Sequence, residues 1–271
     1  MKVALCLHGY FGTLSTNDFT TAAGGYEHIK ERVLSKVDDV DVYVHCWQPE
    51  FEEQINELYS PKESIFEEQV DFDKVCEESG IDQAYIDKGF PRHLTFYKNA
   101  VASRILSFYY SRCQSLQLAL RGEYDWIIAT RFDISQRGGS EVNQIRFFPD
   151  SDRDCLYTTH WDQINQGYGD MWFYGGKQIM QQYSSIYEHA LVDFKPRSEY
   201  ELMVTEAVPE SQFYNCYDLD DPRQFSNELM KPEDQRSKKL MRFPRWRVTD
   251  SHLHHKWFCM QTGLYHATRW V

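Results

Sequence analysis

The sequence predicts an α/β protein in which a mostly parallel central sheet is flanked by helices. Strand and helix patterns alternate over the first 70 residues, and this order favours parallel strands joined by right-handed crossovers. A long amphipathic helix pattern follows at 94–120. The continuous apolar run Trp126–Ala129 then fits a central strand that is covered on both faces.

The first half of the chain carries the clearest patterns. Val40, Val42 and Val44 alternate with more polar residues, as expected for a strand with one buried face. In the helix at 94–120, apolar residues recur at three- and four-residue steps. The segment 71–92 is polar and rich in turn formers, so we expect an excursion over the surface. The expected elements here are a strand at 2–8, a turn at 9–13, a helix at 26–37, a strand at 40–47, a helix at 51–59, and strands at 64–70 and 124–134.

Beyond Gly139 the patterns become shorter and more irregular. No repeat and no linker composition interrupts the chain, so we expect one domain over 1–271. Short strands are expected at 146–148, 155–158 and 171–174, and helices at 177–192 and 199–208.

Composition excludes several classes of protein. The chain has 271 residues, of which 42% are apolar, and its net charge is −12. It has no basic stripe, so a nucleic-acid polymer is not an expected partner. The 7 cysteines are widely spaced and lack a Cys-x-x-Cys motif. We therefore expect reduced thiols in a reducing compartment.

Targeting signals are also missing from the pattern. The apolar run at 1–7 is too short for a signal peptide. No stretch reaches the roughly 20 apolar residues of a membrane span. We expect a cytoplasmic protein without a transmembrane segment, and peripheral contact with a membrane is compatible with this.

A glycine turn follows the first strand. His8-Gly9 resembles an oxyanion loop of α/β-hydrolases, but the Gly-x-Ser-x-Gly elbow that this fold requires is missing. The alternative is a nucleotide-binding turn, in which Gly9, Tyr10 and Gly12 bring the backbone close to a phosphate or a base. The spacing matches neither a dinucleotide fingerprint nor a Walker loop.

The strand at 124–134 ends in Arg131-Phe132-Asp133. Arg131 and Asp133 are two residues apart, so their side chains point to the same side of the strand. Ligands of parallel sheets bind beyond the carboxyl ends of the strands. There Arg131 would hold a phosphate and Asp133 a divalent cation. The alternative is a strand end closed by an ion pair.

The ordered set of these segments resembles a family of bacterial and viral glycosyltransferase-like proteins of GT-A type. The resemblance covers roughly the first two thirds of the chain. The segments that carry it are Val3–Gly9, Asp41–Trp47, Ile55–Lys62, Tyr124–Asp133 and Gly169–Gly175.

The resemblance implies a GT-A-like, Rossmann-like sheet, with a nucleotide-sugar-binding half at 1–137 and an irregular acceptor-side half at 138–271. Asp133 would stand where such enzymes place their Asp-x-Asp carboxylates, and it would hold Mn²⁺ or Mg²⁺ with donor phosphates and water. The chain departs from that motif, because position 131 is Arg. Direct neutralisation of the leaving diphosphate by Arg131 is therefore the alternative.

Further residues are candidates for the same site. Asp170 would face the acceptor, or it would cap a turn. Glu201, or its neighbour Glu199, would act as the general base for the acceptor hydroxyl, or it would only favour the first turn of a helix. His254 lies in the cluster His252, His254 and His255 and would join the metal. Charges on the long helix would reach donor phosphate or remain solvated: Lys98, Arg104 and Arg112.

The function expected from this sequence is transfer of a hexosyl or related sugar from a nucleotide-diphosphate-sugar donor to a glycan or glycolipid-type acceptor, as in polysaccharide biosynthesis. The rival is a non-catalytic protein that keeps the fold and binds a nucleotide or a carbohydrate. The missing first Asp of the Asp-x-Asp motif favours the rival.

Overall fold

The computed structural model describes residues 1–12, 19–83, 101–134, 144–159, 168–195 and 251–271. The described chain forms two compact units that interleave along the sequence. The first comprises Met1–Val70, Phe108–Thr159 and Met171–Ser185, and the second comprises Asp71–Ser107, His160–Asp170 and Ile186–Val271. We call them unit 1 and unit 2. The predicted division into donor and acceptor halves concerns ligand binding and stays a prediction.

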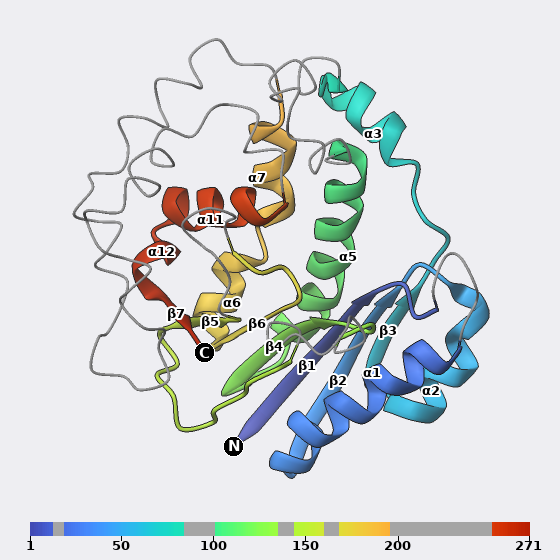
Figure 1. Cartoon of the computed structure of the whole chain (residues 1–271), viewed down its shortest axis with the longest axis vertical. Coiled ribbons are helices and arrows are strands. Elements are labelled where there is room, and N and C mark those ends of the chain that lie inside the picture. The colour runs from blue at the N-terminus through green and yellow to red at the C-terminus, as the bar shows by residue number, and fades with distance from the viewer. Residues whose placement is uncertain (13–18, 84–100, 135–143, 160–167, 196–250) are drawn as a thin grey trace. The chain divides into compact units, whose positions relative to one another are not determined.

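Unit 1 contains the α/β sheet that the sequence predicts. Its strands lie in the order β3-β2-β1-β4-β6-β5, and Figure 1 shows the first four side by side. The sheet is mixed, because β1, β2, β3 and β4 pair in parallel while β6 runs antiparallel to β4 and β5. The elements are β1 (Lys2–Gly9), α1 (Phe19–Arg32), η1 (Leu34–Lys36), β2 (Asp39–Cys46), η2 (Pro49–Phe51), α2 (Glu52–Tyr59), β3 (Glu63–Phe66), β4 (Trp126–Arg131), β5 (Leu156–Thr158), β6 (Trp172–Gly175) and α6 (Lys177–Tyr183).

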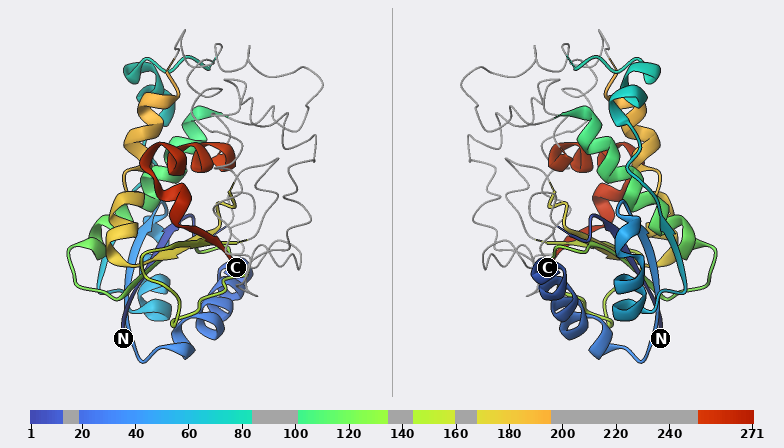
Figure 2. Two further views of the ribbon diagram at one scale, coloured as in Figure 1. Left: turned by 90° about the vertical axis from the view of Figure 1, so that its left-hand side faces the viewer. Right: turned by 90° about the vertical axis from the view of Figure 1, so that its right-hand side faces the viewer.

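The core of unit 1 lies on both faces of this sheet. Every residue of β1 from Val3 to Leu7 is fully buried, as is every residue of β4 from Trp126 to Thr130. Such strands need cover on both sides, and Figure 2 shows α1 and α6 on opposite faces of the sheet. The predicted central position of the apolar run Trp126–Ala129 is confirmed.

The order of the strands reverses between β1 and β4. The chain leaves β1 toward β2 and then β3, and it later returns to pair β4 with the other side of β1. In open parallel sheets, ligands bind at such a switch point, beyond the carboxyl ends of the strands. The fold therefore singles out the ends of β1 and β4.

The described residues of unit 2 are mostly helical. Helix α5 (Ala102–Leu120) begins in this unit and continues, from Phe108, in unit 1. The other elements of unit 2 are α3 (Phe72–Ser79), α7 (Ile186–Asp193), α11 (Ser251–Thr262), α12 (Leu264–Ala267) and the short strand β7 (Thr268–Trp270). In the described part of the chain, no helix is both long and apolar enough to cross a membrane.

Two predictions of secondary structure were wrong in informative ways. The segment expected as a surface excursion contains α3, whose first turn is capped by Asp71 accepting from the Lys74 amide and whose end is a left-handed Gly80. Asp before and Gly after an eight-residue segment are helix boundary signals. The single helix expected at 177–192 is instead α6 and α7, interrupted at Ser184 and Ser185.

Other boundaries moved by a few residues. The first helix lies at Phe19–Arg32, earlier than the range 26–37 that the sequence suggested. The strand candidate at 146–148 is not a strand, whereas those at 155–158 and 171–174 correspond to β5 and β6. The helix expected at 199–208 falls outside the described residues. None of the six described cysteines forms a disulfide.

Candidate functional site

The candidate site lies at the carboxyl ends of β1 and β4, where the strand order reverses. His8 is the register partner of His45 in β2 and of Arg131 in β4, so the three side chains share one face of the sheet. Helix α5 packs on this face, because Arg112 donates to the Nε2 atom of His8 at 3.3 Å. Gly9 and Arg131 therefore end neighbouring strands at the predicted ligand-binding edge.

A chain of hydrogen bonds fixes the Gly9 end of β1. The Gly9 amide donates to Oγ of Ser111 at 2.8 Å, and Ser111 lies 2.7 Å from Nδ1 of His45. The Nε2 atom of His45 lies 2.9 Å from Oε1 of Glu67. Burial lowers the pKa of His45, although Glu67 partly opposes this, so the imidazole is neutral. Ser111 then donates its hydroxyl proton to Nδ1, and His45 donates its Nε2 proton to Glu67.

The hydrogen-bonded series Ser111–His45–Glu67 has the residue types of a serine nucleophile with its base. Its geometry, however, indicates a structural role. Ser111 and His45 are both fully buried. One lone pair of the Ser111 oxygen already accepts from Gly9. A nucleophile must reach a substrate carbonyl or anomeric carbon, and this hydroxyl is enclosed. Its function here is to hold the backbone of Gly9, whose φ of 99° is rare for any residue with a side chain.

The rest of the glycine turn is also held by hydrogen bonds to side chains. Gln48 accepts from the amides of Phe11 and Gly12 through one oxygen, at 2.9 and 2.8 Å. The hydroxyl of Tyr10 donates to Gln69. Three amides of the predicted phosphate-binding turn, those of Gly9, Phe11 and Gly12, thus already have acceptors. A phosphate would have to displace Ser111 or Gln48 to bind them.

Arg131 and Asp133 form a two-point ion pair. Nε of Arg131 donates to Oδ1 of Asp133 at 2.7 Å, and Nη2 donates to Oδ2 at 2.5 Å. Their side chains are 24% and 25% exposed, so solvent reaches both. Phe132 between them is buried and packs edge-on against Phe11. β4 ends at Arg131, earlier than the strand predicted at 124–134, so Asp133 lies in the following turn and the two side chains form the ion pair that was the alternative interpretation.

Arg112 adds a second positive charge to this end of the sheet. It is fully buried and packs its guanidinium 4.2 Å from the centre of the Phe108 ring, while Arg131 lies 5.8 Å from the same ring. Arg112 also donates to the hydroxyl of Tyr183. Burial first, and then Arg112 and Arg131, push the pKa of His8 well below its ordinary value. A solvated position for Arg112 was therefore the wrong alternative.

The remaining predicted residues belong to unit 2 or fall outside the described chain. Asp170 accepts from the hydroxyl of Ser251, the first residue of α11, at 3.2 Å. His254 is fully buried and lies 3.2 Å from a carboxylate oxygen of Asp193. Burial lowers the pKa of His254, with Asp193 opposing the shift. Arg104 is exposed on α5, and Glu201 lies outside the described residues.

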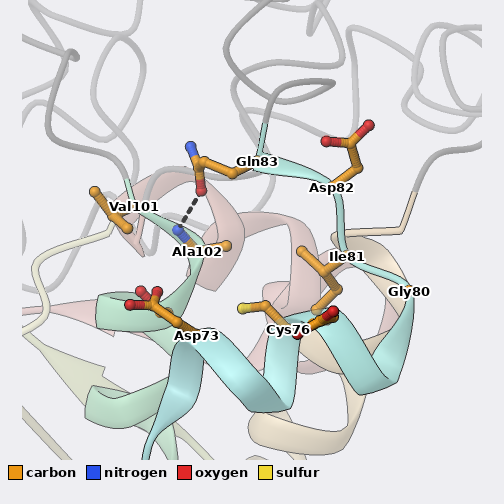
Figure 3. A pocket seen from close by; sticks show the side chains of 10 residues that line it. Asp73, Cys76, Gly80, Ile81, Asp82, Gln83, Val101 and Ala102 are labelled. Atoms are coloured by element: carbon orange, nitrogen blue, oxygen red, sulfur yellow. Dashed lines mark hydrogen bonds between the residues drawn. The ribbon is translucent and has the colours of Figure 1, made fainter.

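Unit 2 also contains a cavity of about 500 Å³ between α3 and the start of α5. Figure 3 shows Gln83 reaching across it to cap the Ala102 amide, at 3.0 Å. Its described lining includes no Lys or Arg, and burial raises the pKa of the Cys76 thiol to about 11. The cavity therefore suits neither a diphosphate nor thiolate chemistry. Its carboxylates come from Asp73, Glu77 and Asp82.

Metal ligation finds little support in the described part of the chain. No group of three or more His, Cys, Asp or Glu side chains is close enough there to hold a metal ion. Both oxygens of Asp133 accept from Arg131, so a cation would have to replace the guanidinium. In this arrangement the residues do not fit a divalent cation.

Sequence reasoning missed Ser111, His45 and Glu67. Ser111 belongs to a set of buried polar residues on α5 that also includes Ser107, Arg112 and Ser115. His45 lies on the face of β2 opposite the valines, which the pattern assigned to the polar side, so the alternation gave no sign that it is buried. Glu67 had no signal beyond its place just after β3.

The chain matches no protein-family model, no curated protein and no solved structure.

Proposed function

We propose that this protein is a glycosyltransferase, which moves a sugar from a nucleotide-diphosphate-sugar donor to a glycan or glycolipid-type acceptor. One observation carries the proposal. The Gly9 turn and the Arg131–Asp133 pair end neighbouring parallel strands at the point where the strand order reverses. This is where α/β sheets bind nucleotides.

The charges at this edge suit a diphosphate. Arg131 is partly exposed. The buried Arg112 packs on the same Phe108 ring and so adds a second positive charge nearby. A guanidinium binds phosphate oxygens through two parallel hydrogen bonds.

In the proposed transfer, the acceptor hydroxyl oxygen bonds to the anomeric carbon as the bond to the diphosphate breaks, and the hydroxyl proton passes to a general base, for which Asp170 or Glu201 is the predicted candidate. Arg131 exchanges Asp133 for oxygens of the diphosphate and neutralises the charge that develops on the leaving group. Asp133, released from Arg131, then accepts from a hydroxyl of the bound donor.

A second function, binding without catalysis, is favoured by a specific observation. Asp133 is held on both oxygens by Arg131, and among the described residues no second carboxylate is paired with it at this strand end. A protein with this site could hold a nucleotide on Arg131 and catalyse nothing. The two functions share the ligand and differ in turnover.

The proposal is tested with a panel of nucleotide-diphosphate sugars, with and without Mn²⁺. Thermal unfolding shows which donors bind, because a ligand that binds only the folded state raises the melting temperature. Mass spectrometry of the same mixtures shows hydrolysis or transfer. A shift with turnover supports the transferase, and a shift without turnover supports the binding protein. No shift with any donor contradicts both.

A further inference from the structure

Glu67 follows β3 directly and lies at the same edge of the sheet as the candidate site. β3 and β2 pair in parallel up to Cys46 and Phe66, and the Glu67 amide donates to the carbonyl oxygen of Cys46 at 3.1 Å. The next strand along is β1, which ends at Gly9. The carboxyl ends of β3, β2, β1 and β4 thus place Glu67 and Arg131 on one edge of unit 1.

The carboxylate of Glu67 accepts hydrogen bonds from two side chains of the protein. His45 donates its Nε2 proton at 2.9 Å, and the hydroxyl of Tyr110 also donates to Glu67. Tyr110 is itself fixed by stacking on Trp47, with ring centres 5.5 Å apart and planes 17° from parallel. A carboxylate on a flexible surface side chain seldom has such support. This one is positioned in advance, as ligand-binding groups are.

Glu67 keeps an outer side that faces solvent. Its side chain is 35% exposed, although His45 beneath it is fully buried. An ionised carboxylate offers about four acceptor positions, and these two donors use about half of them. The remaining positions can accept only from a donor group. An anion such as the diphosphate is repelled, so the complementary ligand group is an N–H or O–H donor, and in a nucleotide sugar the neighbouring donors are pairs of hydroxyls.

We propose that Glu67 binds two neighbouring hydroxyl groups of the nucleotide-sugar donor, with the ribose as the expected source. The inference rests on the proposed function, because the donor places its hydroxyls beside a diphosphate. Carboxylates beyond the carboxyl ends of strands bind ribose hydroxyls in other nucleotide-binding sheets. Glu67 would thereby determine specificity for the ribose, whereas Arg131 would supply the positive charge that binds the diphosphate.

The test compares Glu67→Gln with Glu68→Gln, which removes the same charge from the exposed neighbouring residue. In Glu67→Gln the new side-chain amide keeps an oxygen that can accept from His45, so the fold is retained, and circular dichroism checks this. Affinities are measured by calorimetry for the best-binding donor, its 2′-deoxyribose analogue and the free monosaccharide. We expect the wild type to prefer the ribose form about tenfold, and Glu67→Gln to lose that preference. Glu68→Gln should keep it.

The outcomes separate the two proposals. A wild type that binds neither nucleotide form contradicts the proposed function and this inference together. Binding with an unchanged preference in Glu67→Gln overturns the assignment of Glu67 and leaves the proposed function standing. If Glu67→Gln instead weakens only monosaccharide binding, the hydroxyl pair belongs to the transferred sugar, and the ribose assignment is wrong.

Discussion

Arg131 and Asp133 face each other across Phe132, and both carboxylate oxygens of Asp133 accept from the one guanidinium. The ion pair is partly exposed, at 24% and 25%. Exposed ion pairs stabilise proteins by about 0–1 kcal/mol. Substitution of Arg131 or Asp133 should therefore change stability little. A large effect on ligand binding or turnover would then indicate a functional role.

Asp133→Asn is expected to reduce donor turnover at least tenfold, because Asp133 holds a donor hydroxyl once Arg131 has moved to the diphosphate, and a neutral amide accepts this hydrogen bond more weakly than a carboxylate. Arg131→Gln should weaken donor binding about 10- to 100-fold, as expected for the loss of a charge-assisted contact. Calorimetry and mass spectrometry of the reaction products measure the two effects. Arg121→Gln, which removes an exposed pairing with Glu63, is the control. Turnover that is unchanged in Asp133→Asn would move the chemistry elsewhere.

Ser111→Ala is expected to destabilise the protein by about 2 kcal/mol. It leaves the partly buried Gly9 amide and the buried Nδ1 of His45 without their hydroxyl partner, and such orphaned groups cost about 1–3 kcal/mol. Urea unfolding measures the change. Ser115→Ala is a matched control on the same helix, because Ser115 only donates back to the carbonyl oxygen of Arg112. Equal losses in both variants would contradict the bridging role of Ser111.

Substitutions at Gly9 should depend on backbone conformation rather than on space. Apart from its chain neighbours, no described residue comes within 4 Å of a Cβ added at Gly9, but its φ is 99°. Gly9→Asn should therefore cost less than Gly9→Val, because Asn tolerates positive φ and a β-branched residue does not. We expect the Val variant to lose about 1–3 kcal/mol of unfolding free energy in urea. Similar losses for both variants would point to side-chain crowding.

The sequence was sufficient to predict the sheet because its central strands have clear patterns. β1, β2 and β4 are largely buried runs, although β4 ends at Arg131 and leaves Asp133 in the turn that follows. The register between strands was beyond a single sequence, since it depends on pairing between distant segments. That register is what brings His8, His45 and Arg131 onto one face.

The hydrogen-bond partners of the site residues could not be predicted from the sequence. Ser111 reaches Gly9 across 102 positions of sequence, and Arg112 reaches Tyr183 across 71. The ion pair between Arg131 and Asp133 was foreseen as one alternative, because its members are close in the chain. Gln48 was not, because nothing in its local pattern shows that it caps the turn at 11–12.

Acid should destabilise this protein below its unfolded-state histidine pKa. Burial lowers the pKa of His8, His45 and His254 from an ordinary value of 6.5, so the folded protein keeps them neutral. The unfolded chain takes up more protons as the pH falls below 6.5, and this favours unfolding. Their contribution to stability is thus present above that pH and is lost as the pH falls toward the folded-state values.

His254→Gln isolates the contribution of one histidine to the pH dependence of stability. The amide cannot titrate, so the fall in unfolding free energy between about pH 7.5 and 5.5 should be smaller than in the wild type, even if the variant is less stable at both values. Urea unfolding at the two pH values measures the difference, and His266→Gln, at an exposed position, is the control. An unchanged slope in His254→Gln would mean that the pKa of His254 is the same in the folded and unfolded protein, whereas a steeper fall would mean that Asp193, 3.2 Å away, raises it.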